Sequence, residues 1–208
     1  MIDGDTALDQ ELAIMEDNPD EFALFHDSNQ YKDYTTPYFR KTSQFEQLAS
    51  ISGRRAFLAL LPYVRKAERE LKKMLCGEYA NVLTFINAEN NDEVQNEMLK
   101  LCRSYIATLA MLKGIVQTSM VFIGHKYQLA SNTDSYDTRA KMQVTWLGGM
   151  EQLKASLQED LATVSDDIFN LLEGNEEVFP TFAKENQDTE VDGGTYLSDD
   201  CIGGIGLF

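Results

Sequence analysis

The residue types that most often carry out catalysis are few in this chain and poorly placed for it. Its two histidines, His26 and His125, have no cysteine, aspartate or glutamate at the helical spacing that would create a metal site. The glycine-rich run 203–206 has no following helix to complete a phosphate-binding loop. Acids such as Asp166 and Asp167 are adjacent rather than convergent, unlike paired general acids and bases. The sequence therefore predicts a protein that is not an enzyme and holds no metal and no cofactor, with a small helical enzyme as one alternative.

A basic stretch is a stronger candidate for function, through contact with a partner. Seven bases lie between residues 54 and 73, and against two glutamates they give a net charge of +5. Arg65, Arg69 and Lys73 follow one another at four-residue spacing, so in a helix they share one face. Such a ridge can follow the phosphates of a nucleic acid, and residues 54–73 are the only part of the chain where we expect that contact. Because no aromatic residue lies among the bases from Arg65 to Lys73, we favour a solvated face or a docking surface for an acidic segment.

Two groups of apolar residues are further candidates for partner contacts. Phe22 and Phe25 lie in an acidic N-terminal segment, and Ile205, Leu207 and Phe208 lie in a glycine-rich tail. Exposed apolar residues of this kind insert into a partner's groove or fold back onto their own chain. Together with the three bases of the ridge, these five residues form the predicted partner-binding set.

The segment 105–124 is apolar apart from one charge, Lys113. Its length and apolarity approach those of a membrane span, but a lysine near the midpoint costs about 3 kcal/mol there. The simpler prediction is a central helix that other helices surround on all sides. A membrane-active protein that uses this segment after delivery by a virus is the alternative.

The charge is divided unevenly along the chain, whose net charge is -16. Residues 1–36 hold ten acids and one base, whereas residues 37–158 hold sixteen bases and eleven acids. Residues 159–208 hold thirteen acids and one base. A mildly basic middle is thus flanked by two acidic arms. Their charge either keeps the arms solvated or binds them to basic surfaces of the same chain or of neighbouring subunits.

The elements that must position these residues are predicted to be helices. The composition favours helix over sheet, and cap patterns at 18–21, 43–46 and 90–93 mark helix starts. Residues 31–38 are predicted to form an extended connector, and Pro62 to end or kink a helix. The longest segment is expected from about 90 to about 129, and a last helix from about 136 to 173. That last helix carries a heptad-like apolar seam from Met150 to Leu171.

These observations predict a mainly α protein: a helical bundle with long central helices and extended acidic N- and C-terminal arms. The predicted parts are an N-terminal arm with short helices at 1–41, a bundle core at 42–173 and a Gly-rich arm at 174–208. The N-terminus has no basic or apolar signal region, so we expect synthesis in the cytoplasm without secretion.

The functional hypothesis is a non-catalytic structural or interaction component of a multi-subunit assembly. A phage virion protein (a connector, lining or internal protein) is the concrete case, with other protein subunits as homo- or hetero-oligomeric partners. The alternatives are an acidic regulator that sequesters a basic partner or mimics nucleic acid, and the membrane-active protein. The regulator predicts acids displayed along a rigid helix, whereas most acids of this sequence lie in the two arms.

Overall fold

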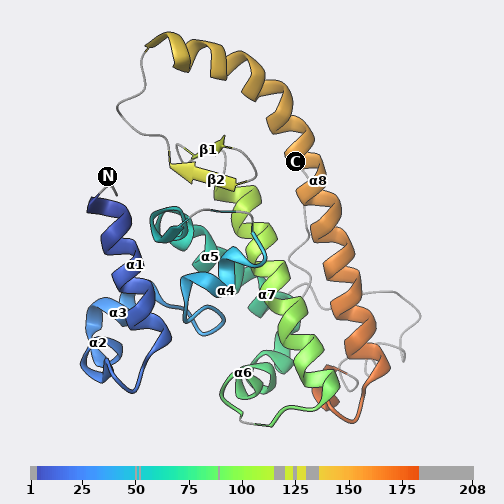
Figure 1. Cartoon of the computed structure of the whole chain (residues 1–208). Coiled ribbons are helices and arrows are strands. Elements are labelled where there is room, and N and C mark those ends of the chain that lie inside the picture. Colours follow the sequence, from blue (N-terminus) through green and yellow to red (C-terminus); the bar gives the residue numbers. More distant parts are fainter. Residues whose placement is uncertain are drawn as a thin grey trace.

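The computed structural model describes residues 4–49, 51, 53–88, 90–114, 120–123, 126–129 and 136–182, with the backbone alone for 4–9, 30, 53, 120–123, 126–129 and 136–150. The described part is mostly helical, which confirms the mainly α part of the predicted fold class (Figure 1). Its elements are α1 (Gly4–Asp17), α2 (Ala23–Asp27), α3 (Asn29–Tyr34), α4 (Thr42–Glu46), α5 (Gly53–Leu75), the 3-10 helix η1 (Cys76–Glu78), α6 (Tyr79–Asn87), α7 (Glu93–Gly114), β1 (Met120–Ile123), β2 (Lys126–Leu129) and α8 (Tyr136–Gly174).

Helix α7 lies between α5 and α8 and packs against both (Figure 1). In α5 the fully buried residues recur every three or four positions, at Leu60, Val64, Ala67, Leu71 and Leu75. In α7 nearly every side chain from Tyr105 to Met111 is buried, as expected of a helix covered on two sides. Burial of each large apolar side chain contributes about 1.5–3 kcal/mol, so this three-helix contact is the main source of stability.

Helix α8 has nearly the predicted bounds, and the predicted seam faces the core. Of the seam residues, Leu161 and Ile168 are buried, while Leu153, Leu157, Val164 and Leu171 are partly buried against the same cluster. The side chain of Met150, the first residue of the predicted seam, lies outside the described part. After α8 the chain turns back, and a fully buried Phe179 packs its ring 6.2 Å from that of Phe85. The seam therefore orients α8 with one face on α7 and the other outward.

The predicted helix from about 90 to 129 begins as expected but ends early. At its start the Asp92 side chain accepts a bond from Gln95 N at 2.8 Å, and the Gln95 side chain accepts one from Asp92 N at 3.1 Å. The helix stops at Gly114, and β1 then pairs antiparallel with β2, Met120 opposite Leu129. The prediction was wrong here because periodicity cannot distinguish a short apolar strand from a buried helix. The β-branched and aromatic residues of 121–123 were the signal for strand.

Two further boundary predictions need correction. Of the two outcomes predicted for Pro62, an end or a kink, the end does not occur: Pro62 lies inside α5, which continues to Leu75. Burial continues across the proline, at Leu60, Leu61 and Val64, and outweighs its cost of about 3 kcal/mol. The pattern at 43–46 starts only the short α4, which ends at Glu46.

The N-terminal predictions also need correction. Residues 19–22 form a turn, and α2 starts at Ala23. The predicted extended connector 31–38 is instead helical up to Tyr34, because Ser28 caps α3 by accepting a bond from Tyr31 N at 3.1 Å.

Helix α7 contains the first half of the apolar segment 105–124, and that half is already covered by α5 and α8. Within the described ranges, no helix combines the length and apolarity needed to span a membrane.

Candidate interaction surfaces

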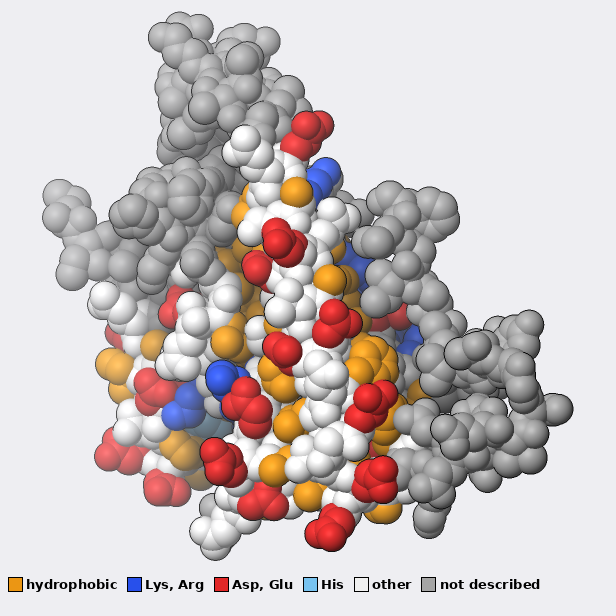
Figure 2. Space-filling view, turned by 90° about the vertical axis from the view of Figure 1, so that its right-hand side faces the viewer, with side chains coloured by type: hydrophobic (Ala, Val, Ile, Leu, Met, Phe, Trp, Pro, Cys, Tyr) orange, Lys and Arg blue, Asp and Glu red, His pale blue; other side chains and the backbone are white. Residues whose placement is uncertain are grey.

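The outward face of α8 is acidic along the part whose side chains are described. Its exposed acids are Glu151, Glu159, Asp160, Asp166, Asp167 and Glu173, and we call these six residues the acidic stripe. Figure 2 looks onto α8 and shows acidic side chains along the described part of its surface. The heptad seam places apolar residues inward on α7, so the acids of the stripe face outward.

The acidic stripe has a regular spacing and no internal compensation. Glu159 and Asp160 are followed seven residues later by Asp166 and Asp167, and Glu173 comes seven residues after Asp166. At 1.5 Å per residue, each step of seven covers about 10.5 Å. Among the described side chains, none of the six carboxylates takes part in a salt bridge. Within the described part of the chain, the stripe therefore carries negative charge that no salt bridge neutralises.

The outward face of α5 is basic. Its second half exposes Arg65, Lys66, Arg69, Lys72 and Lys73, and we call these five residues the basic ridge. The predicted set Arg65, Arg69 and Lys73 therefore does lie on one exposed face. Two members rest on rings: Lys66 Nζ lies 5.2 Å from the ring centre of Tyr63, and Lys72 Nζ lies 5.7 Å from that of Tyr79.

Among the described side chains, few acids compensate the charges of the basic ridge. Lys73 pairs with Glu70 at 3.4 Å, but both side chains are largely exposed, so the pair contributes little. The Arg65 guanidinium donates to the backbone carbonyl of Asp33, which is neutral. Arg69 has no ion-pair partner in the part of the chain that the structure describes. Within the described ranges, most charges of the ridge are thus not neutralised by an acid.

The first base of the predicted stretch, Arg54, is not on the ridge. Arg54 forms a salt bridge with Glu16 of α1, and both side chains are less than a tenth exposed. The second carboxylate oxygen of Glu16 accepts a bond from Thr42 N at 3.2 Å. One residue further on, Asp17 pairs with Lys41 at 2.9 Å. The acidic N-terminal segment therefore binds bases of its own chain, one of the two alternatives that the sequence left open.

The predicted apolar contact residues of this segment are only partly accessible. Phe22 and Phe25 are half-buried, and the Phe25 ring packs 5.1 Å from that of Tyr31. The most exposed large apolar side chain there is Leu24, at 91%. Sequence reasoning missed Leu24 because a short apolar run does not show which of its members faces outward. The tail residues Ile205, Leu207 and Phe208 lie outside the described residues.

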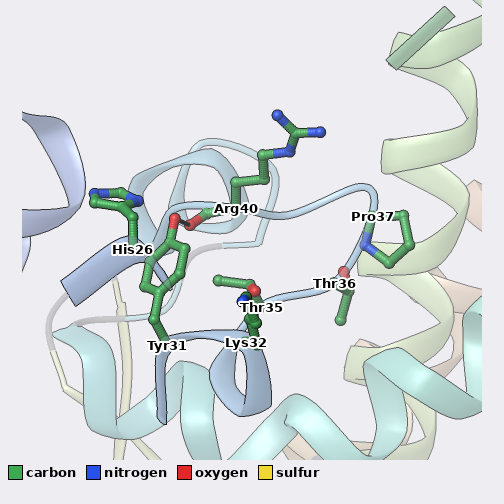
Figure 3. Close-up of a pocket in the computed structure, with 7 residues that line it drawn as sticks. All are labelled: His26, Tyr31, Lys32, Thr35, Thr36, Pro37 and Arg40. Atoms are coloured by element: carbon green, nitrogen blue, oxygen red, sulfur yellow. Dashed lines mark hydrogen bonds between the residues drawn. The ribbon is translucent and has the colours of Figure 1, made fainter. Parts of the chain in front are cut away.

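A pocket of about 410 Å³ opens beside α2 and α3, lined by His26, Tyr31, Lys32, Thr35, Thr36, Pro37 and Arg40 (Figure 3). The polar groups at its centre already bond to the backbone: His26 Nε2 with the carbonyl of Met15 and Tyr31 Oη with that of Arg40, each at 2.8 Å. The Arg40 side chain points away from His26 and Tyr31 (Figure 3). The pocket residues therefore serve first to fix the fold of the N-terminal segment.

A group of polar side chains lies inside the core, where the loop after α3 meets α5 and α7. Burial raises the pKa of Cys102 to about 12, so the thiol stays protonated at neutral pH and is a poor nucleophile. Burial also raises the pKa of Tyr38 and that of Glu68. Among the described residues, no cluster of histidine, cysteine, aspartate and glutamate has the geometry to hold a metal ion.

Comparison with protein-family models, with curated proteins and with solved structures finds no match to this chain. The two charged helix faces, on helices that α7 separates, are therefore the candidate interaction surfaces (Figure 1).

Proposed function

We propose that this protein is a non-catalytic interaction component of a multi-subunit assembly, and that it docks through the acidic stripe onto a basic partner surface. The observation that carries the proposal is the row of six exposed carboxylates on α8, none of them in a salt bridge among the described side chains. In this proposal α5, α7 and α8 form the helical bundle that displays the stripe. A large particle such as a phage virion is one setting for such a component.

The electrostatics of the stripe support docking over solvation alone. Adjacent acids repeated on one rigid face repel one another, and a row of bases on a partner would relieve that repulsion. One exposed ion pair contributes about 0.2–1 kcal/mol, so a single pair would decide nothing. Four or five pairs formed together give a useful affinity, and the concentrated negative field accelerates encounter with a basic partner.

The same stripe favours a second candidate, an acidic regulator that sequesters a basic protein or mimics nucleic acid. Its signature is acids on a rigid helix, and α8 carries them in that form. The two candidates differ in competition: a regulator of this kind loses its partner when duplex DNA is added, whereas an assembly component keeps it.

Binding of a short poly-lysine peptide to the full chain, followed by fluorescence anisotropy, tests the proposal. The α8 variant combines Glu159→Gln, Asp166→Asn, Asp167→Asn and Glu173→Gln. Its matched control combines Asp20→Asn, Glu21→Gln, Asp27→Asn and Asp33→Asn, which removes the same charge from exposed positions outside α8. We expect affinity to fall about tenfold in the α8 variant, since four pairs at about 0.35 kcal/mol each amount to about 1.4 kcal/mol. We expect a much smaller loss in the control, and equal losses in both would refute the proposal.

A further inference from the structure

We infer that the basic partner surface is the basic ridge of a second copy of this chain, so that the acidic stripe of one copy docks on the basic ridge of the next. This inference rests on the proposed function and names its partner. It follows from a match between two surfaces that lie on different helices of the same molecule.

The two surfaces share one spacing. On α5, Arg65 and Lys66 are followed seven residues later by Lys72 and Lys73. On α8, Glu159 and Asp160 are followed seven residues later by Asp166 and Asp167. In both helices a pair of like charges thus recurs after about 10.5 Å, or two turns. Two such helices side by side can place each pair of bases opposite a pair of acids.

The intervening positions also fit. Arg69 projects from the ridge between the two basic pairs, and its planar guanidinium can bind a carboxylate through two parallel hydrogen bonds. On α8 the residues between the acid pairs are small or apolar, with Ala162 and Thr163 exposed. They leave room for the long side chains of the opposite helix to lie along the surface.

The pairing cannot form within one molecule because α7 lies between α5 and α8. Within the described ranges, no salt bridge joins α5 to α8. Since the two surfaces lie on separate helices on either side of α7, the stripe and the ridge of one copy contact different neighbours, and the contact between copies is heterologous. Repetition of such a contact closes into a ring or grows into an open filament, in contrast to a twofold dimer.

The net charge of -16 makes this association depend on salt in a recognisable way. In dilute buffer the copies repel over long distances, because the Debye length is about 30 Å at 0.01 M. Near 0.1 M it falls to about 10 Å, which screens the distant charges but only partly screens pairs in contact. At 1 M it is about 3 Å, and the contacting pairs are screened too. Association should therefore be strongest at intermediate salt.

Two charge-reversed variants of the full chain test the inference by sedimentation velocity. The first carries Asp166→Lys and Asp167→Lys in α8, and the second carries Arg69→Glu and Lys73→Glu in α5. All four positions are exposed, and circular dichroism and thermal unfolding check that both variants fold. We expect the unchanged chain to associate near 0.1 M salt, and each variant alone to associate more than about tenfold more weakly. An equimolar mixture of the two should associate again, because each reversed face then meets its complement.

Monomeric unchanged chain at all three salt concentrations would overturn the inference, as would a mixture that does not associate. If poly-lysine binding still depends on the acidic stripe, only the choice of partner has failed and the proposed function stands. If the chain does not self-associate and poly-lysine binding does not depend on the stripe, the inference and the proposed function both fail. Binding of duplex DNA that is lost with Arg69→Glu and Lys73→Glu, without self-association, would assign the ridge to nucleic acid and overturn the inference.

Discussion

Helices α5 and α8 are built alike but differ in the sign of the charge on their outward faces. Each buries an apolar stripe against α7, and each turns a charged face outward, basic on α5 and acidic on α8. The inward stripes are what the fold requires, because burial and not surface charge determines how such helices pack. Folding does not determine whether the outward face is acidic or basic. The outward face of α5 is basic and that of α8 is acidic, and this separation of charge is therefore evidence about contacts made after folding.

The largest expected effect on stability distinguishes the buried Arg54 from the exposed basic ridge on the same helix. Arg54→Ala leaves Glu16 buried without its partner, so we expect the free energy of unfolding to fall by about 4 kcal/mol. Arg69→Ala is the matched control on the exposed ridge and should change it by less than about 0.5 kcal/mol. Urea denaturation measures both, and similar losses would remove the distinction between the two kinds of base.

The next effect tests whether α5 and α8 are equal partners of α7. Leu71→Ala in α5 and Ile168→Ala in α8 each remove a fully buried side chain. We expect each to lower the free energy of unfolding by about 3 kcal/mol, through lost burial and the cavity that remains. A much smaller loss for Ile168→Ala in urea denaturation would show that α8 is attached less firmly than α5.

Substitution of two glycines by alanine compares the packing at the α5 contact with that at the end of α8. A Cβ at Gly114, where α7 meets α5, would clash with the Leu60 side chain and lie 3.0 Å from Tyr63 Cδ2. Gly114→Ala should therefore destabilise the protein by about 2 kcal/mol. A Cβ at Gly174, at the end of α8, would meet nothing within 4 Å, so Gly174→Ala should be neutral or slightly stabilising. Thermal unfolding of the two variants side by side checks this, and equal shifts would contradict it.

Glu68 of α5 differs from the exposed acids of α8 in its burial. Burial raises its pKa above 4.5, so the folded chain holds this proton to higher pH than the unfolded chain does. The group therefore costs stability increasingly as pH rises through the window between these two pKa values. Glu68→Gln should raise the unfolding temperature by a few degrees at pH 7 and make no difference below pH 4. A lower unfolding temperature at pH 7 would show that bonds to the carboxylate outweigh the cost of burial.

The smallest expected effect on stability is that of a substitution in the acidic stripe, and it tests whether the charged face of α8 is independent of folding. Asp166→Asn, on the acidic stripe, should change the free energy of unfolding by less than about 0.5 kcal/mol, because the side chain is exposed. Urea denaturation in 0.1 M and 1 M salt measures it. A loss above about 1 kcal/mol would mean that the stripe takes part in folding.

The sequence predicted the helical class, the start of α7 and the bounds of α8, because cap patterns and a long periodic seam are local and redundant. It left open whether Pro62 would end or kink its helix, and burial on both sides of the proline keeps it inside α5. It failed at 120–129, because periodicity does not distinguish a short apolar strand from a buried helix. It also predicted the shared face of Arg65, Arg69 and Lys73. The acids from Glu159 to Glu173 were counted with an acidic arm, because composition ignores the period of the helix that carries them.

The length of α8 has a mechanical consequence. Its 39 residues correspond to about 58 Å, whereas the 22 residues of α7 correspond to about 33 Å. The N-terminal part of α8 therefore reaches beyond α7, as Figure 1 shows. A small rotation of α8 about its packed end would become a larger displacement at the other end, as in a lever. A partner that docks at the acidic stripe and rotates α8 would then displace the N-terminal end of the helix, far from the contact.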